Sequence, residues 1–178
     1  MGKAWSHERT GGKEEWLTPP YILKSLGPFD LDPCACAEPR PWDTATLHIA
    51  PPDDGLQADW NGRVWLNPPY GNETGRWLVR MAEHGIGIAL IFARTDTKMF
   101  HEYVFPYVSG LLFLHGRLYF YYPSGLEAGP AGAPSVLLAY DSPKSERTYN
   151  ADALRNSGLP GFFVPMNAEC FATGRRRR

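Results

Sequence analysis

The 178-residue sequence has no apolar run of the length that a membrane helix needs. A membrane-spanning helix takes about 20 consecutive apolar residues. The first residues also lack the apolar stretch of a signal peptide. We therefore expect a cytoplasmic protein with no membrane partner.

Cysteine is scarce, and its spacing does not indicate a metal site. Cys34 and Cys36 are one residue apart, and Cys170 is far along the chain. Zinc sites usually combine a Cys-x2-Cys pair with a second pair of ligands, whereas the five histidines here are scattered. We expect reduced thiols, as in cytosolic proteins, and no bound metal.

A basic excess is also absent, because 18 Lys and Arg residues are balanced by 19 Asp and Glu residues. Nucleic-acid-binding domains are usually basic, so the overall charge argues mildly against one. The last four residues, Arg175 to Arg178, are all basic. Such a run could contact phosphates, or it could be a solvated tail.

Length and composition indicate one globular domain of ordinary size. The hydrophobic fraction is 43% and the charged fraction is 21%, as in typical folded domains. Residues 1–15 are polar and unpatterned, which predicts a flexible lead. We place the domain over residues 16–170 and a basic tail over residues 171–178.

Apolar runs and turn residues predict strands that alternate with helices. The expected strands are residues 29–33, 63–66, 86–92 and 135–140, with a weak strand or helical turn in 42–50. The expected helices are residues 21–26, 73–84 and 96–103, with Thr18 as an N-cap and Gly85 as a C-cap. Residues 111–114 and 118–122 are expected to form a hairpin, and 123–134 a loop.

This alternation predicts an α/β open sheet, in which ligands bind outside the carboxyl ends of the strands. Asp32-Pro33 and Asn67-Pro68 both lie at such ends, so we expect them to be close in space. Only about thirty residues separate the first strand from Val64, too few for a full set of βα units. The second and third strands of the sheet should therefore be short or missing.

The tetrapeptide Asn67-Pro68-Pro69-Tyr70 directly follows a short apolar run. The amide oxygen can accept a hydrogen bond from an amino group, the prolines fix the backbone, and the tyrosine offers a flat face for stacking. This combination predicts a site for a planar heterocycle with an amino group, such as adenine. A Pro-Pro pair also ends ordinary strands, so the flanking sequence has to decide.

Six ordered blocks make the chain resemble the phage-type, Dam-like DNA N6-adenine methyltransferases, from about Trp16 to Tyr140. The blocks are Trp16-Leu17-Thr18-Pro19, Phe29 to Ala35, Asp54-Gly55-Leu56 with Asp59-Trp60, Asn67 to Gly71, Ala93 to Thr97, and Gly116 to Phe120. The resemblance implies a Rossmann-like methyltransferase fold with a mixed sheet and a terminal antiparallel pair. It also implies S-adenosylmethionine as donor, adenine in double-stranded DNA as acceptor, and a phage or prophage gene in a bacterial host.

The resemblance further implies a set of cofactor-binding residues: Trp16, Thr18, Pro19, Asp30, Asp32, Cys34, Ala35, Asp54 and Asn67. Thr18 and Pro19 would hold the methionine end of the donor. Asp32 would accept from its amino group or from a ribose hydroxyl, and Asp30 faces the same side of the strand.

Some cofactor contacts remain open at this stage. Asp53 and Asp59 are alternatives to Asp54 for the adenine of the donor, and Glu38 is a candidate for the ribose. Many methyltransferases place Gly-x-Gly after the first strand, whereas this chain has Pro33-Cys34-Ala35-Cys36-Ala37. Its donor site must therefore tolerate Cβ atoms at this turn.

The catalytic set implied by the resemblance is Asn67, Pro68, Pro69 and Tyr70. The Asn67 side chain and the Pro68 carbonyl would accept hydrogen bonds from N6, and Tyr70 would stack on an adenine flipped out of the duplex. Many relatives carry Asp in place of Asn67. Because Asn cannot take up a proton, this residue would position and polarise the amine without deprotonating it.

Two arginines and two competing functions complete the predictions. Arg94 or Arg117 would contact DNA phosphate, unless the arginine forms a salt bridge with Asp96. The tetrapeptide also suits methylation of another amino group, on an RNA base or a protein glutamine. A non-catalytic DNA-binding module of the same fold is a further alternative.

Overall fold

The computed structural model describes residues 15–142 and 149–166. Most of the predicted N-terminal lead, Cys170 and the run from Arg175 to Arg178 lie outside the described residues, so those predictions stay predictions. Within the described ranges, no helix combines the length and hydrophobicity needed to span a membrane.

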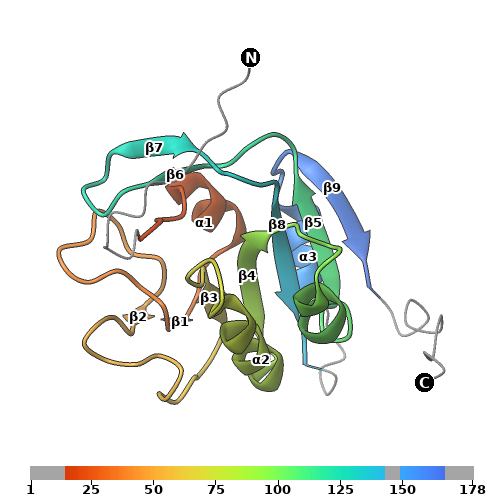
Figure 1. Cartoon of the computed structure of the whole chain (residues 1–178), viewed down its shortest axis with the longest axis horizontal. Coiled ribbons are helices and arrows are strands. Elements are labelled where there is room, and N and C mark those ends of the chain that lie inside the picture. Colours follow the sequence, from red (N-terminus) through yellow and green to blue (C-terminus); the bar gives the residue numbers. More distant parts are fainter. Residues whose placement is uncertain (1–14, 143–148, 167–178) are drawn as a thin grey trace.

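A seven-stranded sheet with the order β2-β1-β3-β4-β8-β5-β9 forms the centre of the molecule (Figure 1). Its strands are β1 (Leu31–Asp32), β2 (Leu47–His48), β3 (Val64–Leu66), β4 (Gly87–Phe92), β5 (Gly110–Leu114), β8 (Ser135–Tyr140) and β9 (Gly161–Pro165). Strands β2, β1, β3 and β4 are parallel, and β8 is antiparallel to both β4 and β5. The sheet is therefore mixed with a parallel core, which confirms the predicted α/β class.

The second strand is short, as predicted: β2 has two residues and lies at the sheet edge. No further strand occurs in the described stretch between β2 and β3. The centre is made of β4 and β8, whose apolar runs are buried on both faces. Gly87 allows β3 and β4 to approach closely, because a Cβ there would lie 2.2 Å from the Val64 carbonyl oxygen.

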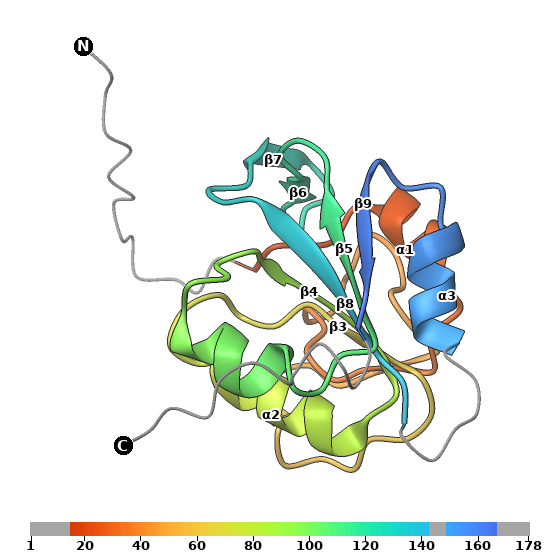
Figure 2. The ribbon, with the colours of Figure 1, turned by 90° about the vertical axis from the view of Figure 1, so that its right-hand side faces the viewer.

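Helices cover both faces of the sheet. Helix α2 (Thr74–His84) and the π-helical turn η1 (Phe100–Val104) pack on one face, and α1 (Pro20–Leu26) and α3 (Tyr149–Asn156) on the other (Figure 2). The alternation of strand side chains divides the core accordingly. Val64 and Leu66 join the hydrophobic cluster beneath α2, whereas Trp65 joins the cluster beneath α1.

The predicted hairpin of residues 111–114 and 118–122 is wrong. β5 lies between β8 and β9 in the main sheet, so both of its edges are already paired. β6 (Tyr119–Tyr121) instead pairs with β7 (Glu127–Pro130) in a separate two-stranded sheet. The loop predicted over 123–134 thus contains strand β7, whose partner is the preceding strand β6.

Three further predictions need correction. Ser135–Tyr140 is not the last strand, since the Phe162-Phe163-Val164 patch forms the edge strand β9. The helix expected over 96–103 runs over residues 98–104 and contains the π-helical turn η1, and helix α3 was not predicted. Thr18 does not cap α1: the N-cap position is Pro19, and no side chain caps the helix.

Candidate active site

A cavity of about 640 Å³ lies at the carboxyl ends of β1 and β3. Its walls come from three segments of the chain: residues 15–18, residues 32–56 and residues 65–77. Strands β1 and β3 are direct neighbours, with Leu31 paired to Val64. The predicted proximity of Asp32-Pro33 and Asn67-Pro68 is therefore confirmed.

The Asn67 amide is held in one orientation. Its Nδ2 atom donates to the Trp16 carbonyl oxygen at 2.6 Å, and its Oδ1 atom accepts from the Tyr70 hydroxyl at 3.2 Å. Because a backbone carbonyl can only accept, the nitrogen must face Trp16. The Oδ1 atom is thereby fixed as the hydrogen-bond acceptor on the other side of the amide.

Tyr70 packs tightly against the end of β4. Its ring stacks on Phe92 with a centroid separation of 4.1 Å and an interplanar angle of 10°. Burial raises the pKa of its hydroxyl well above the usual range, so the group remains a hydrogen-bond donor. One face of this ring is covered by Phe92, and any ligand would meet the rest of the ring.

The turn that follows the tetrapeptide is fixed by Thr74. Its hydroxyl donates to the Pro69 carbonyl at 2.7 Å and accepts from the Gly71 N–H at 3.0 Å. No described residue donates a hydrogen bond to the Pro68 carbonyl. Asn67 Oδ1 and this carbonyl thus provide acceptor capacity beside the cavity.

Asp32 is a buried carboxylate in the cavity wall. It accepts hydrogen bonds from the Cys34 N–H at 2.9 Å and from the Thr44 hydroxyl. Desolvation is the largest effect on it and raises its pKa from 3.8 to about 6, although both hydrogen bonds and the charge of Arg40 act in the opposite direction. A cationic ligand group beside Asp32 would favour the charged carboxylate.

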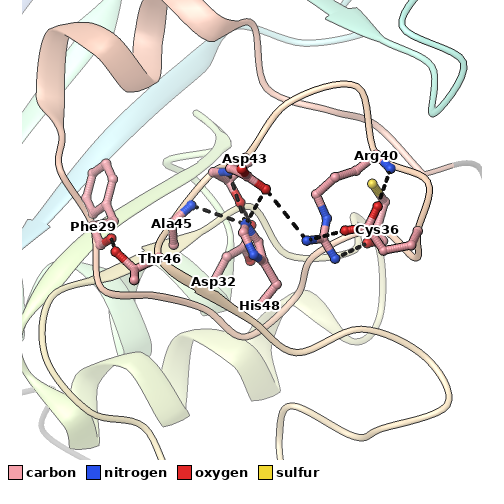
Figure 3. Close-up of polar contacts among 10 residues, drawn as sticks. Phe29, Asp32, Cys36, Arg40, Asp43, Ala45, Thr46 and His48 are labelled. Carbon is pink, nitrogen blue, oxygen red and sulfur yellow. Dashed lines mark hydrogen bonds and ion pairs between the residues drawn. The ribbon is translucent and has the colours of Figure 1, made fainter.

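The loop after β1 carries a further charged residue that the sequence analysis did not identify. Arg40 lines the cavity, and its side chain is only 13% exposed. It pairs with Glu38 at 2.8 Å and reaches back to the Cys36 carbonyl at 3.4 Å (Figure 3). It lies in a loop with no recognisable periodicity, and no local motif places it at the cavity.

His48 organises the same loop from β2. Its Nε2 atom accepts from the N–H groups of Thr44 and Ala45, at 3.2 and 3.3 Å (Figure 3). Burial and the nearby positive charge of Arg40 lower the His48 pKa, which favours the neutral ring that can accept. The loop therefore places Thr44 against Asp32 through backbone hydrogen bonds.

Thr18 contributes a buried hydroxyl with no partner. The residue is 1% exposed, lines the cavity, and has no described hydrogen-bond partner at Oγ1. The preceding Leu17 is tied to β6 by two backbone hydrogen bonds with Tyr121. The Thr18 hydroxyl therefore has the capacity to bond to a ligand in the cavity.

The cavity brings together most of the residues predicted for the site. Those that line it are Trp16, Thr18, Asp32, Cys34, Ala35, Asp54, Asn67, Pro68, Pro69 and Tyr70. Asp53 also lines it, whereas Asp59 does not. Which of these acids contacts the adenine of the donor stays a prediction, with Asp53 and Asp54 at the cavity and Asp59 outside its lining.

Two predicted cofactor residues lie outside the cavity lining. Pro19 is buried at the start of α1. The Asp30 carboxylate accepts from the Arg63 backbone N–H at 2.6 Å and is engaged in holding β1 to β3. Residue Asp30 precedes the two-residue strand β1, so the alternation that should have placed it beside Asp32 does not extend to it. Glu38 is likewise not in the lining.

Arg94 and Arg117 are exposed and lie beyond the ends of β4 and β5. Both strands are antiparallel to β8, so their carboxyl ends are at the same edge of the sheet. Neither arginine forms an ion pair with Asp96 within the described residues. The Arg117 side chain donates to the Ala131 carbonyl at 3.4 Å, and both arginines lie at the same ends of the strands as the cavity.

Comparison with known proteins supplies the family. The model of the DNA N-6-adenine-methyltransferase (Dam) family matches residues 5–158. Searches among curated proteins and among solved structures give no match. The mixed sheet with its parallel core is consistent with the Rossmann-like methyltransferase fold of this family. The family match covers most of the chain, including both strand ends that form the cavity, and the chain therefore belongs to the Dam family of DNA N6-adenine methyltransferases.

Proposed function

We propose that this DNA adenine methyltransferase uses S-adenosylmethionine as donor and methylates N6 of an adenine that is extruded from DNA and placed against Asn67 and Tyr70. The observation that carries the proposal is the fixed Asn67 amide, whose nitrogen is bonded to Trp16 and whose oxygen is therefore an acceptor. When bound, S-adenosylmethionine supplies an electrophilic methyl group on its sulfonium.

Asn67 Oδ1 and the Pro68 carbonyl act on the amino group of the target. Hydrogen bonds to both acceptors pull N6 toward tetrahedral geometry and localise its lone pair, which is otherwise delocalised into the ring. N6 would accept the methyl group that S-adenosylmethionine supplies, and its extra proton would pass to water because the Asn67 amide cannot take it up. Catalysis here is positional and electrostatic.

The contacts of Asn67 give a physical reason for an amide at this position. The Nδ2 atom lies 2.6 Å from the Trp16 carbonyl oxygen. An aspartate in the same place would set a carboxylate oxygen against that carbonyl, and the two acceptors would repel each other. Trp16 therefore acts as a positioning residue that favours Asn over Asp in this chain.

Tyr70 and Pro69 complete the catalytic set. The Tyr70 ring would contact the target base with the face that Phe92 does not cover, and its hydroxyl holds Asn67 Oδ1. Pro69 is held by Thr74, which fixes the turn under the base. Rigid support of this kind matters because small displacements of catalytic groups reduce rates strongly.

Features of the cavity support a donor site there. Its volume of about 640 Å³ lies within the range of small-molecule sites. Asp32 would accept from the donor's amino group, and the unpartnered Thr18 hydroxyl would bind its methionine end. Trp16, Cys34, Ala35 and Asn67 would line the rest, with Asp54 or Asp53 at its adenine. Asp30 and Pro19 are not part of this proposal.

Arg94 and Arg117 would contact phosphates of the DNA. Both are exposed at the carboxyl edge of the sheet. Phosphate contacts fix the register of a protein on DNA and carry no sequence information.

Replacing Asn67 with Ala tests the proposal. We expect kcat for methyl transfer to adenine-containing DNA to fall about 100- to 1000-fold, as for the loss of one preorganised catalytic hydrogen-bonding group. Asn61→Ala is the control, because Asn61 is exposed and does not line the cavity. Circular dichroism checks the fold of both variants, and full activity of Asn67→Ala would refute the assigned role.

A further inference from the structure

The donor proposed for this cavity carries one anionic group. S-adenosylmethionine has a sulfonium, an α-ammonium and an α-carboxylate, and an ionised carboxylate taken out of water needs a cation or several hydrogen-bond donors. The acidic side chains that line the cavity are Glu15, Asp32, Asp53, Asp54 and Glu73. These acids would repel the donor's carboxylate, so a basic side chain in the wall is needed to hold it.

Within the described part of the chain, two basic side chains line the cavity, those of Arg40 and Arg76. Arg76 lies on α2, pairs with Glu73 at 2.7 Å, and has a side chain that is 62% exposed. The Arg40 side chain is only 13% exposed. Attraction between charges is stronger where water and salt screen them less, so Arg40 is the better partner for a bound anion.

The hydrogen bonding of Arg40 is incomplete for a guanidinium so little exposed. Its Nη1 atom lies 2.8 Å from Glu38 and 3.8 Å from Asp43, whose side chains are 66% and 76% exposed (Figure 3). Its Nη2 atom donates to the Cys36 carbonyl at a long 3.4 Å, and its buried Nε atom has no described partner. Because a guanidinium has five N–H donors, Arg40 retains capacity to bond to a ligand.

Arg40 belongs to the same wall of the cavity as Asp32. Both residues line it, and the positive charge of Arg40 lowers the pKa of the Asp32 carboxyl against the larger effect of burial. The loop between them is fixed, because Thr44 donates to Asp32 and the Thr44 N–H donates to His48. The wall thus presents a carboxylate and a guanidinium, the two charges that complement the zwitterion of an amino acid.

We propose that Arg40 binds the α-carboxylate of S-adenosylmethionine while Asp32 accepts from its α-ammonium, so that the enzyme selects its donor by the carboxylate. The proposal rests on the proposed function, in which this cavity takes the donor. Arginine suits this role because its planar, permanently charged group matches the geometry of a carboxylate. Arg40 is a binding residue for the donor and takes no part in the transfer of the methyl group.

Calorimetric titration with two donors tests this. S-adenosylmethionine is compared with its decarboxylated form, which keeps the sulfonium, the amine and the nucleoside and lacks only the carboxylate. We expect the wild-type protein to bind S-adenosylmethionine about 30-fold more tightly, the value of a charge-assisted hydrogen bond. Arg40→Gln should reduce this preference to about twofold or less, because the decarboxylated donor has no group for Arg40 to bind and only S-adenosylmethionine loses a contact.

Glu38→Gln and Arg76→Gln are the matched controls. Glu38→Gln removes the ion pair of Arg40 and keeps its guanidinium, and Arg76→Gln removes the other basic side chain described in the cavity wall. Both should keep the preference for the carboxylate, and circular dichroism checks the fold of each variant.

Three results overturn this proposal alone. They are a wild-type protein that binds both donors equally, an equal loss of affinity for both donors in Arg40→Gln, and loss of the preference in either control. The second result would show that Arg40 acts by holding the loop. A wild-type protein that binds neither donor overturns the proposed function as well.

Discussion

Two buried charged side chains lie at opposite ends of two neighbouring strands and have different roles. Arg63 precedes β3 at the amino edge and is 7% exposed, whereas Asp32 ends β1 at the carboxyl edge and is 3% exposed. Arg63 is committed to the protein itself. Its Nε atom donates to Asn150 Oδ1, and its Nη1 atom donates to the carbonyls of Leu26 and Pro28, all at 2.7 Å.

Asp32 has fewer hydrogen bonds than Arg63, although the buried Nη2 atom of Arg63 has no described partner. Asp32 accepts from one backbone N–H and one hydroxyl, faces a cavity, and has its pKa raised by burial. Arg63 by contrast lies between the rings of Phe29 and Tyr149, at 4.2 and 4.9 Å. The comparison indicates that Arg63, at the amino ends of the strands, stabilises the fold, whereas Asp32, at their carboxyl ends, is available to a ligand.

The largest expected effect is a loss of stability from a substitution at the amino ends of the strands. Arg63→Leu should lower the free energy of unfolding by about 3 kcal/mol, because buried partners of the guanidinium lose their donor. Urea denaturation measures the change. Lys98→Ala is the control, since Lys98 pairs with Glu102 on the surface and should matter by less than about 1 kcal/mol. A wild-type midpoint for Arg63→Leu would contradict the structural role of this arginine.

A substitution at the carboxyl ends of the strands should weaken binding of the donor and leave the fold intact. Asp32→Asn should weaken binding of S-adenosylmethionine about 30-fold, as expected when a charge-assisted hydrogen bond is lost. Asp30→Asn is a matched control two residues away, because the Asp30 carboxylate lies outside the cavity. Calorimetric titration measures both. Equal losses in the two variants would show that the carboxylates act through the stability of β1.

These two charges also show what the sequence could predict. Asp32 and Asn67 each follow a recognisable strand and precede proline, so their place at one sheet edge follows from the topology of parallel strands. Arg63 has no such signal, because its partners are distant in the sequence. Arg40 lies in a loop, and no strand end marks its place in the cavity wall. The sequence therefore predicted those site residues whose positions are determined by the ends of strands.

Some secondary-structure elements were predicted wrongly for a related reason. Helix α2 has an apolar stripe and a glycine C-cap, with Gly85 at φ 78°, and it was predicted correctly. Strand β9 and helix α3 have little periodicity, and they form because β5 and β8 offer them surfaces to pack on. The β6–β7 pairing was missed because local pattern alone favoured pairing with the preceding strand.

The protonation of Asp32 gives the next, smaller effect. Burial raises its pKa to about 6, so the free protein holds a proton there below that pH. If the donor's cationic group binds the ionised form, donor affinity should rise about tenfold from pH 5 to pH 7. Asp32→Asn should remove this dependence. In the absence of donor the sign is opposite: protonation of the folded state is favoured from about pH 4 to 6, so stability falls as the pH rises through that window.

The smallest expected effects come from substitutions of two buried threonines. Thr18 has a hydroxyl without a partner, while the Thr74 hydroxyl is bonded to the Pro69 carbonyl. Valine has nearly the same shape but no hydroxyl, so Thr18→Val removes an unsatisfied polar group and should raise the free energy of unfolding by about 1 kcal/mol. Thr74→Val should lower it by about the same amount.

Donor binding should separate the two threonines in the opposite sense. Thr18→Val should weaken the affinity for S-adenosylmethionine about fivefold, the value of one lost hydrogen bond. A variant that is more stable but binds less well is the signature of a group kept for its ligand. Thermal unfolding with and without donor measures both quantities in one experiment. If Thr18→Val is less stable and binds the donor normally, the Thr18 hydroxyl stabilises the fold. The division of roles between the amino and carboxyl ends of the strands then fails at this residue.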